Sequence, residues 1–409
     1  MGYLIFRAIV FALLLVSVSG YSQNIEQLKK DIAYLASDEL EGREAGTEGA
    51  YKAGKYLKAR FVEEGLKPHR GGDYFQEFYV IPAKNPHEMA KLGEASDSAL
   101  TVRNVVGFLD NGAKMTVVIG AHFDHLGYGG VNSLFREGEA VHNGADDNAS
   151  GTAALMQIAQ MLKGKNKNNN YLFIAFTGEE KGLWGSNYFC KNPLIDLNTV
   201  NYMINMDMIG RLNEEKALAI NGTGTSPLWE EAFQWTGSKE LKLIKKKSGI
   251  GPSDHTSFYM KDIPVLHFFT GQHADYHKPA DDADKINYSG ILEVADFIVA
   301  IINALDKHGE LPFTKTKNEE GDTPRFTVTL GVVPDYLYAE EGMRIDGVSD
   351  GKPAMKAGII SGDVVVQMGA MEVKDMMGYM KALAVFKKGD KTMVKVKRKN
   401  EVLEFEVEF

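Results

Sequence analysis

The chain has 409 residues, of which 44% are hydrophobic and 25% are charged, a composition typical of a soluble globular protein. At this length we expect two or three domains. The formal net charge of -9 argues against a broad nucleic-acid-binding surface. The single cysteine, Cys190, excludes an internal disulfide framework, and a lone cysteine is more often buried and inert than catalytic.

The first twenty residues have the pattern of an export signal. Arg7 precedes an apolar run at residues 8–16, and the small residues after it predict cleavage following Gly20, with Ser22 as the alternative. A membrane anchor is the competing interpretation, but the apolar run is too short to favour a transmembrane helix. We therefore expect residues 1–20 to be a signal peptide. The mature protein should then be periplasmic or secreted, without a stable membrane span.

Apolar runs and helical patterns alternate along the next 280 or so residues. Because the apolar runs are nearly continuous, they are typical of strands buried on both faces of a sheet. The pattern predicts an α/β fold with a mixed, mainly parallel sheet sandwiched by helices. The predicted strands are residues 115–124, 168–180, 199–210 and 263–271, and the main predicted helices between and after them are residues 150–164, 183–192 and 288–308.

Polar motifs lie at the carboxyl ends of three of these predicted strands, at "HFD", "GEE" and "MDM". Sites in such folds lie beyond the carboxyl ends of the strands, so we expect these motifs to meet. Mixed imidazole and carboxylate ligands suit zinc better than magnesium or calcium, and a surplus of carboxylates suggests two metal ions that share a bridging ligand. The candidate residues are His122, Asp124, Asp146, Asp147, Glu179, Glu180, Asp207, His273 and His277.

Taken together, the motifs resemble the two-zinc exopeptidases related to bacterial leucyl aminopeptidases and glutamate carboxypeptidases. The resemblance covers roughly residues 24–305. It is carried by "HFDHLG", "NGADDNASG", "GEEKGLWGS", "NMDMIGR", "SDHTSF" and the H-x3-D-x2-D-x-I run that begins at His277. The early segment "LASDELEGREAGTEG" is also similar to the amino-terminal part of many bacterial members.

The resemblance implies a ligand for each metal position. His122 and Asp207 would bind the first zinc ion, and Glu180 and His277 the second. Asp146 would be the bridging carboxylate that joins the two ions.

The resemblance also implies three supporting roles. Asp147 would be joined to Asp146 by a cis peptide bond. Asp124 would orient His122 and raise its basicity. Glu179 would be the general base, since one of two adjacent glutamates can bind metal while its neighbour faces the reacting water.

Two points in this assignment stay open from the residues alone. His273 also lies near the second histidine position, although the aspartates that follow match the family only if His277 is the ligand. Some relatives place a tyrosine just ahead of the "SDH" motif to stabilise the oxyanion. Here Ile250 and Gly251 occupy that neighbourhood. His255 could replace the tyrosine or make only a hydrogen bond behind the site.

A change of composition separates the last quarter of the chain. Residues 309–324 are polar, with two prolines and two glycines, a composition that predicts a linker. Residues 325–409 resemble a small β-rich PDZ domain, carried by "LGVV", "PAMKAG" and "GDVV". By this resemblance Leu330, Gly331 and Val332 would border a groove that takes an extended peptide by strand addition. A domain that only packs on or stabilises its neighbour is the alternative.

From these features we expect an exported metallo-aminopeptidase, residues 24–308, that removes N-terminal residues from peptides with two zinc ions and a glutamate general base. The expected partners are peptides with a free N-terminus and a possible PDZ ligand, without nucleic acid. A carboxypeptidase on the same scaffold would need cations for the substrate carboxylate, and Arg211 is the one arginine beside a metal motif. An inactive scaffold with a peptide-binding PDZ domain is the other alternative.

Overall fold

The computed structural model describes residues 24–69, 72–81, 91–130, 132–236, 240–316, 328–335, 338, 340–348, 351–399 and 401–409. The predicted signal peptide, residues 1–20, lies outside this part of the chain. So do residues 317–324 of the predicted linker and the first three residues of the predicted PDZ domain.

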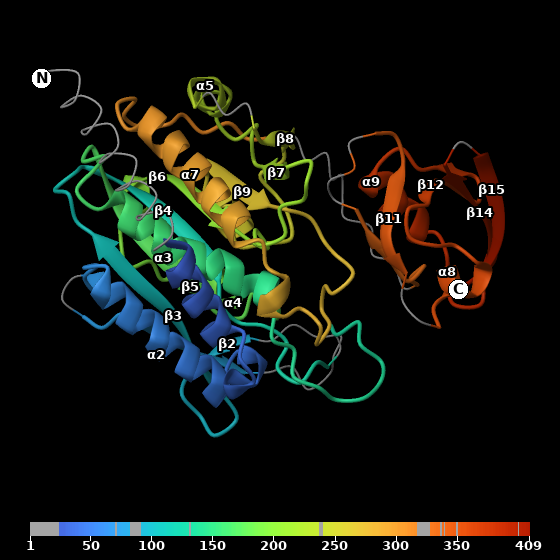
Figure 1. Ribbon diagram of the computed structural model, residues 1–409, viewed down its shortest axis with the longest axis horizontal. Coiled ribbons are helices and arrows are strands. Elements are labelled where there is room, and N and C mark those ends of the chain that lie inside the picture. Colours follow the sequence, from blue (N-terminus) through green and yellow to red (C-terminus); the bar gives the residue numbers. More distant parts are fainter. Residues whose placement is uncertain are drawn as a thin grey trace, which may run out of the picture.

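A nine-stranded mixed sheet forms the centre of the larger domain (Figure 1), in the order β2-β1-β3-β5-β4-β6-β9-β7-β8. The four central strands β5, β4, β6 and β9 are parallel, and β3 and β7 flank them in antiparallel orientation. The strands are β1 (Phe75–Ile81), β2 (Lys91–Gly93), β3 (Leu100–Leu109), β4 (Met115–His122), β5 (Asn169–Phe176), β6 (Val200–Met206), β7 (Ala217–Asn221), β8 (Lys242–Lys245) and β9 (Val265–Phe269).

The central strands confirm the predicted fold class, and they coincide with the four apolar runs of the sequence. The outer strands have no counterpart among the predicted strands. Polar residues such as Arg103 and Asn104 in β3 interrupt their apolar pattern.

Helices cover both faces of this sheet, because successive side chains of a strand point to opposite faces. In β4, Val117 and Ile119 pack into the core that contains α2, α3 and α7, whereas Val118 packs on the other side with Phe189 of α4 and Phe258 of α6. The helices are α2 (Glu48–Glu63), α3 (Gly151–Leu162), α4 (Trp184–Lys191), α5 (Leu228–Trp235), α6 (His255–Tyr259) and α7 (Tyr288–Leu305). Shorter helical turns are η1 (Asp38–Arg43), η3 (Ala145–Ser150), η4 (Leu197–Thr199) and η5 (Ala283–Lys285), and residues 24–35 are also helical.

The closing helix α7 is long and apolar enough by length and composition to cross a membrane. In the fold its apolar side chains are buried in the core, including Ile291, Ile298 and Ile302. Its start is fixed by Asn287, whose side-chain oxygen accepts the N–H of Gly290 at 2.9 Å. α7 is thus built into the core as one of the layers on the sheet.

The predicted linker begins later than its composition suggests. Leu311 is buried, and its N–H donates to the Asn201 side chain at 2.8 Å. Phe313 packs against the Tyr259 ring, whose hydroxyl lies 3.0 Å from Thr316 Oγ1. Residues 311–316 therefore belong to the larger domain. The prediction of a linker from residue 309 is wrong there, because a few apolar anchors in a polar segment suffice to attach it.

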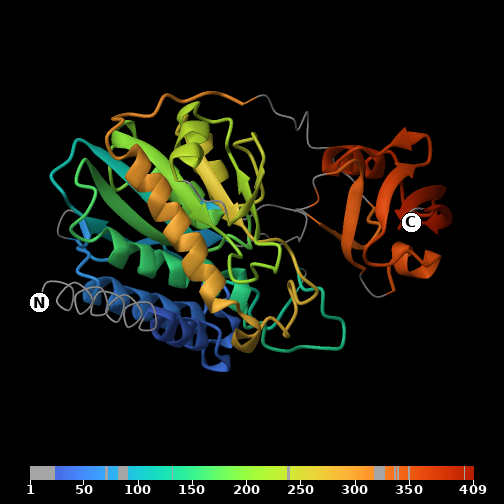
Figure 2. The same cartoon turned by 45° about the horizontal axis from the view of Figure 1, so that its top comes forward.

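A second, smaller domain lies to one side of the sheet (red in Figure 2) and has its own core. Its antiparallel strands follow the order β10-β11-β12-β14-β15, with β13 paired to β12. The elements are β10 (Val332–Pro334), β11 (Met343–Val348), α8 (Pro353–Ala357), β12 (Val364–Met368), β13 (Met371–Glu372), α9 (Met376–Leu383), β14 (Lys391–Arg398) and β15 (Glu401–Glu408). The predicted small β-rich domain is present over the described residues of its range.

Candidate metal centre

The carboxyl ends of the central parallel strands bring the predicted ligands together. β4 ends at His122, which pairs with Phe176 at the end of β5, so the "TGEE" loop starts beside this histidine. Asp207 follows directly after β6. Because parallel strands place these ends at one edge of the sheet, residues far apart in the chain share one site.

One group of possible ligand atoms surrounds His122. Its Nε2 lies 3.2 Å from Asp207 Oδ1 and 3.4 Å from Asp147 Oδ1. The ligand atoms of these three residues all lie within 4.8 Å of one another. Such spacing allows all three to reach one cation.

A second group surrounds the other oxygen of the same aspartate. His277 Nε2 lies 3.3 Å from Asp147 Oδ2 and 3.3 Å from Glu180 Oε2. His125 Nδ1 lies 2.8 Å from Glu180 Oε1 and belongs to the same cluster. Asp147 therefore presents one oxygen to each group, the geometry expected of a bridging carboxylate.

The aspartate with this geometry lies one residue further along the chain than the bridging position that the sequence resemblance implies. Asp146, the predicted bridging residue, instead accepts the N–H of Gly210 at 2.6 Å, and its other oxygen lies 3.2 Å from His273 Nε2. The non-proline cis peptide bond joins Asp147 to Asn148, not Asp146 to Asp147. Adjacent side chains point in different directions, so sequence adjacency alone cannot say which of two neighbouring aspartates faces the site.

Another carboxylate accepts hydrogen bonds from the backbone at Asp147. Asp281 Oδ2 accepts the N–H groups of both Asp146 and Asp147, at 2.9 and 3.0 Å. Asp281 Oδ1 in turn lies 3.3 Å from Arg211, which also pairs with Asp275 at 3.1 Å. This network fixes the direction of the Asp147 side chain.

Glu179 lies in the same cavity wall as both ligand groups. Its N–H donates to Asp124 Oδ1 at 3.1 Å, and its carbonyl accepts the N–H groups of Gly182 and Leu183. Burial raises the pKa of the Glu179 carboxyl well above its usual value. The nearby His122 lowers this pKa, and the charge of Asp207 raises it further. Glu179 is thus a half-buried residue on a hydrogen-bonded turn.

The electrostatics of the cluster fit a bound cation. Burial raises the pKa of Asp147, and the nearby Glu180 charge raises it further. Burial alone would also raise the pKa of Glu180, but His277 and His125 bring it well below the usual value. Burial lowers the pKa of His277, but Glu180 and Asp147 outweigh it and bring that pKa to about 11. Four carboxylates meet at this edge of the sheet, with Asp147 buried and Glu179, Glu180 and Asp207 half-buried. Such a group is unfavourable without positive charge, and imidazole with carboxylate is a donor set for zinc.

The comparisons with known proteins agree with this geometry. The model for peptidase family M28 matches residues 104–302, and the PDZ domain model matches residues 315–409. Residues 104–302 are a peptidase family M28 domain. The PDZ match likewise identifies the C-terminal domain, whose predicted fold is thereby confirmed.

The relatives of this M28 domain include a protein named probable leucine aminopeptidase from Arthroderma otae, 28% identical over 217 residues. That match covers 49% of this chain and 56% of the relative, so the chain spans about half the length of the curated relatives it matches.

Two solved structures show the same fold. A zinc aminopeptidase from Bacillus subtilis is 18% identical with a TM-score of 0.53, and the match covers 73% of this chain and 96% of that one. A Zn-dependent exopeptidase from Parabacteroides distasonis is 19% identical with a TM-score of 0.55, and the match covers 68% and 97%.

The structure separates the two histidine candidates of the M28 domain and adds a third. His277 lies against both Asp147 and Glu180, whereas His273 lies against Asp146. His125 is absent from the predicted set, although it directly follows Asp124 in the "HFDH" motif. The second histidine of the short "HFDH" motif was the feature of the sequence that could have identified His125 as a candidate.

The structure also places the residues around the "SDH" motif, where the sequence left two roles open for His255. Ile250 and Gly251 line the cavity, as their position suggested. His255 is fully buried and stacks on His267, with ring centroids 4.5 Å apart, and it is not among the residues that line this cavity. Tyr276 does line the cavity, and its ring stacks on that of His277 with the ring centroids 3.8 Å apart. Among the described residues, Tyr276 is thus the tyrosine in contact with a candidate ligand.

Asp124 connects the predicted base to the predicted ligand His122. Its Oδ1 accepts the N–H of Glu179 and lies 3.7 Å from His122 Nδ1, whose nearer partner is the Asp124 carbonyl at 3.2 Å. We expect Asp124→Asn to lower kcat/KM by about 10–100-fold with the fold intact. Zinc affinity and kinetics test this, with the exposed Asp97→Asn as control. Unchanged affinity and turnover in Asp124→Asn would remove the role.

A fully buried arginine holds together the loops that carry these residues. Arg43 is 0% exposed and donates to the carbonyls of Phe123, Asn143 and Gly144, at 2.7, 2.7 and 3.0 Å, and also to that of Leu35. Burial lowers the pKa of Arg43 to about 10, although the charges of nearby carboxylates oppose this. The loops of the site are therefore connected by the buried guanidinium of Arg43, which donates to backbone carbonyls.

We expect Arg43→Lys to lower the free energy of unfolding by about 2–4 kcal/mol, because an ammonium has three donors and cannot reproduce the planar fork. Each buried carbonyl left without a donor contributes to this loss. Denaturant unfolding measures it, with the exposed Arg136→Lys as the matched control. Equal stability of the two variants would contradict the role of Arg43.

Proposed function

We propose that the protein is a zinc-dependent aminopeptidase with two zinc ions and Glu179 as general base. The observation that carries the proposal is Asp147, which lies between the His122–Asp207 pair and the Glu180–His277 pair. The names of the relatives and solved structures support zinc and an aminopeptidase activity. His122, Asp147 and Asp207 would hold one ion, and Asp147, Glu180 and His277 the other.

The metal ions would supply positive charge that polarises the scissile carbonyl and lowers the pKa of water. The chain itself supplies proton transfer. The Glu179 carboxylate takes the proton from the attacking water and returns it to the nitrogen of the leaving amine. Asp124 holds the Glu179 backbone through its 3.1 Å hydrogen bond, so the carboxylate stays at the cavity wall.

The contacts of Arg211 favour an aminopeptidase over a carboxypeptidase. Arg211, the arginine that a carboxypeptidase could use, pairs with Asp281 and Asp275 and supports the backbone at Asp147. Its guanidinium is therefore engaged in the structural network. Carboxylates dominate the centre, and they attract the protonated amine of a substrate N-terminus.

The test is hydrolysis by the purified full-length protein, loaded with zinc, of three peptides that share one sequence. One has both ends free, one a blocked N-terminus and one a blocked C-terminus. We expect cleavage of the first and third only, loss of activity with a chelator, and recovery with zinc. Cleavage of the first and second peptides, with the C-blocked peptide left intact, would show a carboxypeptidase, and no cleavage of any peptide would show an inactive scaffold.

The number of ions and the cellular location belong to the same proposal. We expect two zinc ions per chain by metal analysis after dialysis. We also propose that the chain is exported, on the basis of the signal pattern in residues 1–20. Amino-terminal sequencing of the protein from its source cells should find a start at Tyr21 or Gln23. A start at Met1 would contradict export by this signal.

A further inference from the structure

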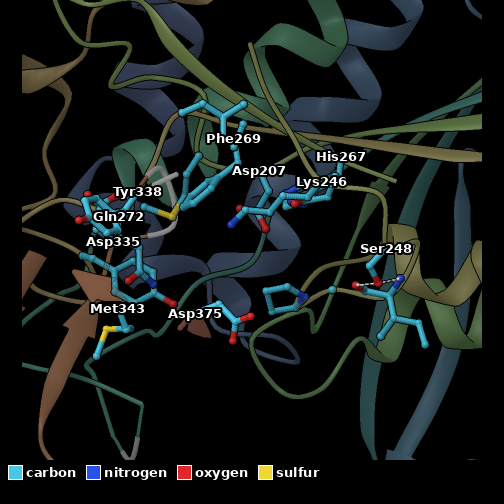
Figure 3. A pocket seen from close by; sticks show the side chains of 18 of the residues that line it. Asp207, Lys246, Ser248, His267, Phe269, Gln272, Asp335, Tyr338, Met343 and Asp375 are labelled. Carbon is cyan, nitrogen blue, oxygen red and sulfur yellow. Dashed lines mark hydrogen bonds between the residues drawn. The ribbon is translucent and has the colours of Figure 1, made fainter. Parts of the chain in front are cut away.

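The cavity at the metal centre is shared by the M28 and PDZ domains. Its volume is about 800 Å³, in the range of ligand-binding sites. Figure 3 shows Asp207 and His267 of the M28 domain lining the same pocket as Asp335, Tyr338 and Met343 of the PDZ domain. A ligand bound at the metal centre thus meets the PDZ domain where it leaves the M28 domain.

An edge strand of the PDZ sheet leads to this cavity. β10 stands at the end of the sheet order and pairs with β11 on one side. Within the described residues, its other edge has no strand partner. β10 begins after Gly331 and ends at Pro334, directly before Asp335 in the cavity wall. The strand therefore runs toward the metal centre.

We propose that the PDZ domain binds the substrate polypeptide itself, as an extended chain added to β10, while the amino end of that chain lies at the metal centre. The inference rests on the proposed aminopeptidase function and extends it to the substrate class. The preferred substrates are then peptides several residues long, rather than dipeptides.

The direction of β10 agrees with this arrangement. In an antiparallel pair, the amino end of the added chain lies beside the carboxyl end of the strand. The carboxyl end of β10 is the end at the cavity, so an antiparallel substrate directs its N-terminus to the metal ions. A parallel chain would direct its carboxyl end there, which an aminopeptidase cannot use.

The cavity walls fit an extended peptide, because both offer apolar side chains to a chain that passes between them. Tyr338, Met343 and Met380 lie on the PDZ side, and Ile250 and Phe269 on the M28 side. Strand addition supplies main-chain hydrogen bonds, and pockets for alternate side chains supply selectivity.

The two walls of the cavity also carry residues of opposite charge. Lys246 of the M28 domain and Asp335 of the PDZ domain are near enough to interact electrostatically. The two residues therefore face each other across the cavity, and Asp335 also pairs with Arg344 of its own domain at 2.5 Å.

The experiment compares a short and a long substrate on full-length zinc-loaded protein. The short one is a leucyl anilide, and the long one is a leucyl decapeptide amide with a free N-terminus. Met380→Ala and Tyr338→Ala remove side chains from the PDZ wall. Met393→Ala, in β14 and 42% exposed, is the matched control outside the cavity.

For each wall variant we expect kcat/KM on the decapeptide to fall by roughly five- to tenfold, mainly through a higher KM, as for a well-packed contact side chain. The anilide should be hydrolysed at the unmodified rate by all variants, and Met393→Ala should change neither substrate. Circular dichroism of the variants verifies folding. If Met380→Ala is less stable, Tyr338→Ala still gives the answer.

Equal kinetics on the decapeptide for wall variants and wild type would overturn the inference, as would a parallel loss on both substrates. Hydrolysis of the anilide separates this failure from failure of the proposed function. If the unmodified protein hydrolysed neither substrate, the aminopeptidase function would be contradicted and the inference with it.

Discussion

Glu179→Gln should leave two zinc ions bound and lower turnover by about 100- to 10,000-fold, the range attributed to a positioned general base. Glutamine keeps the volume of the side chain and one acceptor oxygen, but it cannot take a proton from water. The backbone N–H that anchors this residue to Asp124 is unchanged. The ligand groups around Asp147 are also unchanged, so metal content and stability should stay close to wild type.

The adjacent substitution Glu180→Gln is the matched comparison. Glu180 lies 3.3 Å from His277 and 2.8 Å from His125, inside the second ligand group. We therefore expect it to lose zinc from one position as well as activity. Bound zinc by elemental analysis and steady-state rates on both variants decide the assignment. If Glu179→Gln lost zinc and Glu180→Gln kept it, the two roles would be reversed.

The second large effect concerns the bridging carboxylate. Asp147→Asn should reduce zinc binding at both positions, because one side chain serves both groups through Oδ1 and Oδ2. An amide has one oxygen and no charge, so at most one position keeps a ligand here. Activity should fall by more than the roughly 10–100-fold that follows loss of a residue behind the ligands.

Asp146→Asn is the control that tests which aspartate is the bridge. An asparagine oxygen can still accept the N–H of Gly210, the 2.6 Å contact that Asp146 makes now. We expect this variant to bind two zinc ions and to keep most of its activity. Metal titration of the two variants, followed by zinc analysis, gives the comparison. Loss of zinc in Asp146→Asn with retention in Asp147→Asn would restore the assignment made from sequence resemblance.

The order of elements in the M28 domain could be predicted because burial leaves a direct mark on sequence. The runs that became β4, β5, β6 and β9 are buried along their whole length, so they appear as continuous apolar segments. The convergence of "HFD", "GEE" and "MDM" followed from parallel strand order alone. The outer strands were not predicted, since they are short, as in β2, β7 and β8, or carry polar residues within the run, as in β1 and β3.

The sequence by itself determined the α/β and PDZ domains, the kinds of ligand and the strand ends that carry them, because these follow from local periodicity and from motif chemistry. Only the tertiary structure decided that Asp147 faces both ligand groups and that Asp146 faces Gly210 and His273. The same holds for the position of Arg43, whose carbonyl partners come from loops about a hundred residues away. The structure also showed the cavity shared with β10 of the PDZ domain. The physical reason is common to all three: the direction of a side chain depends on backbone torsion angles set by distant contacts, and these leave no periodic pattern in the local sequence.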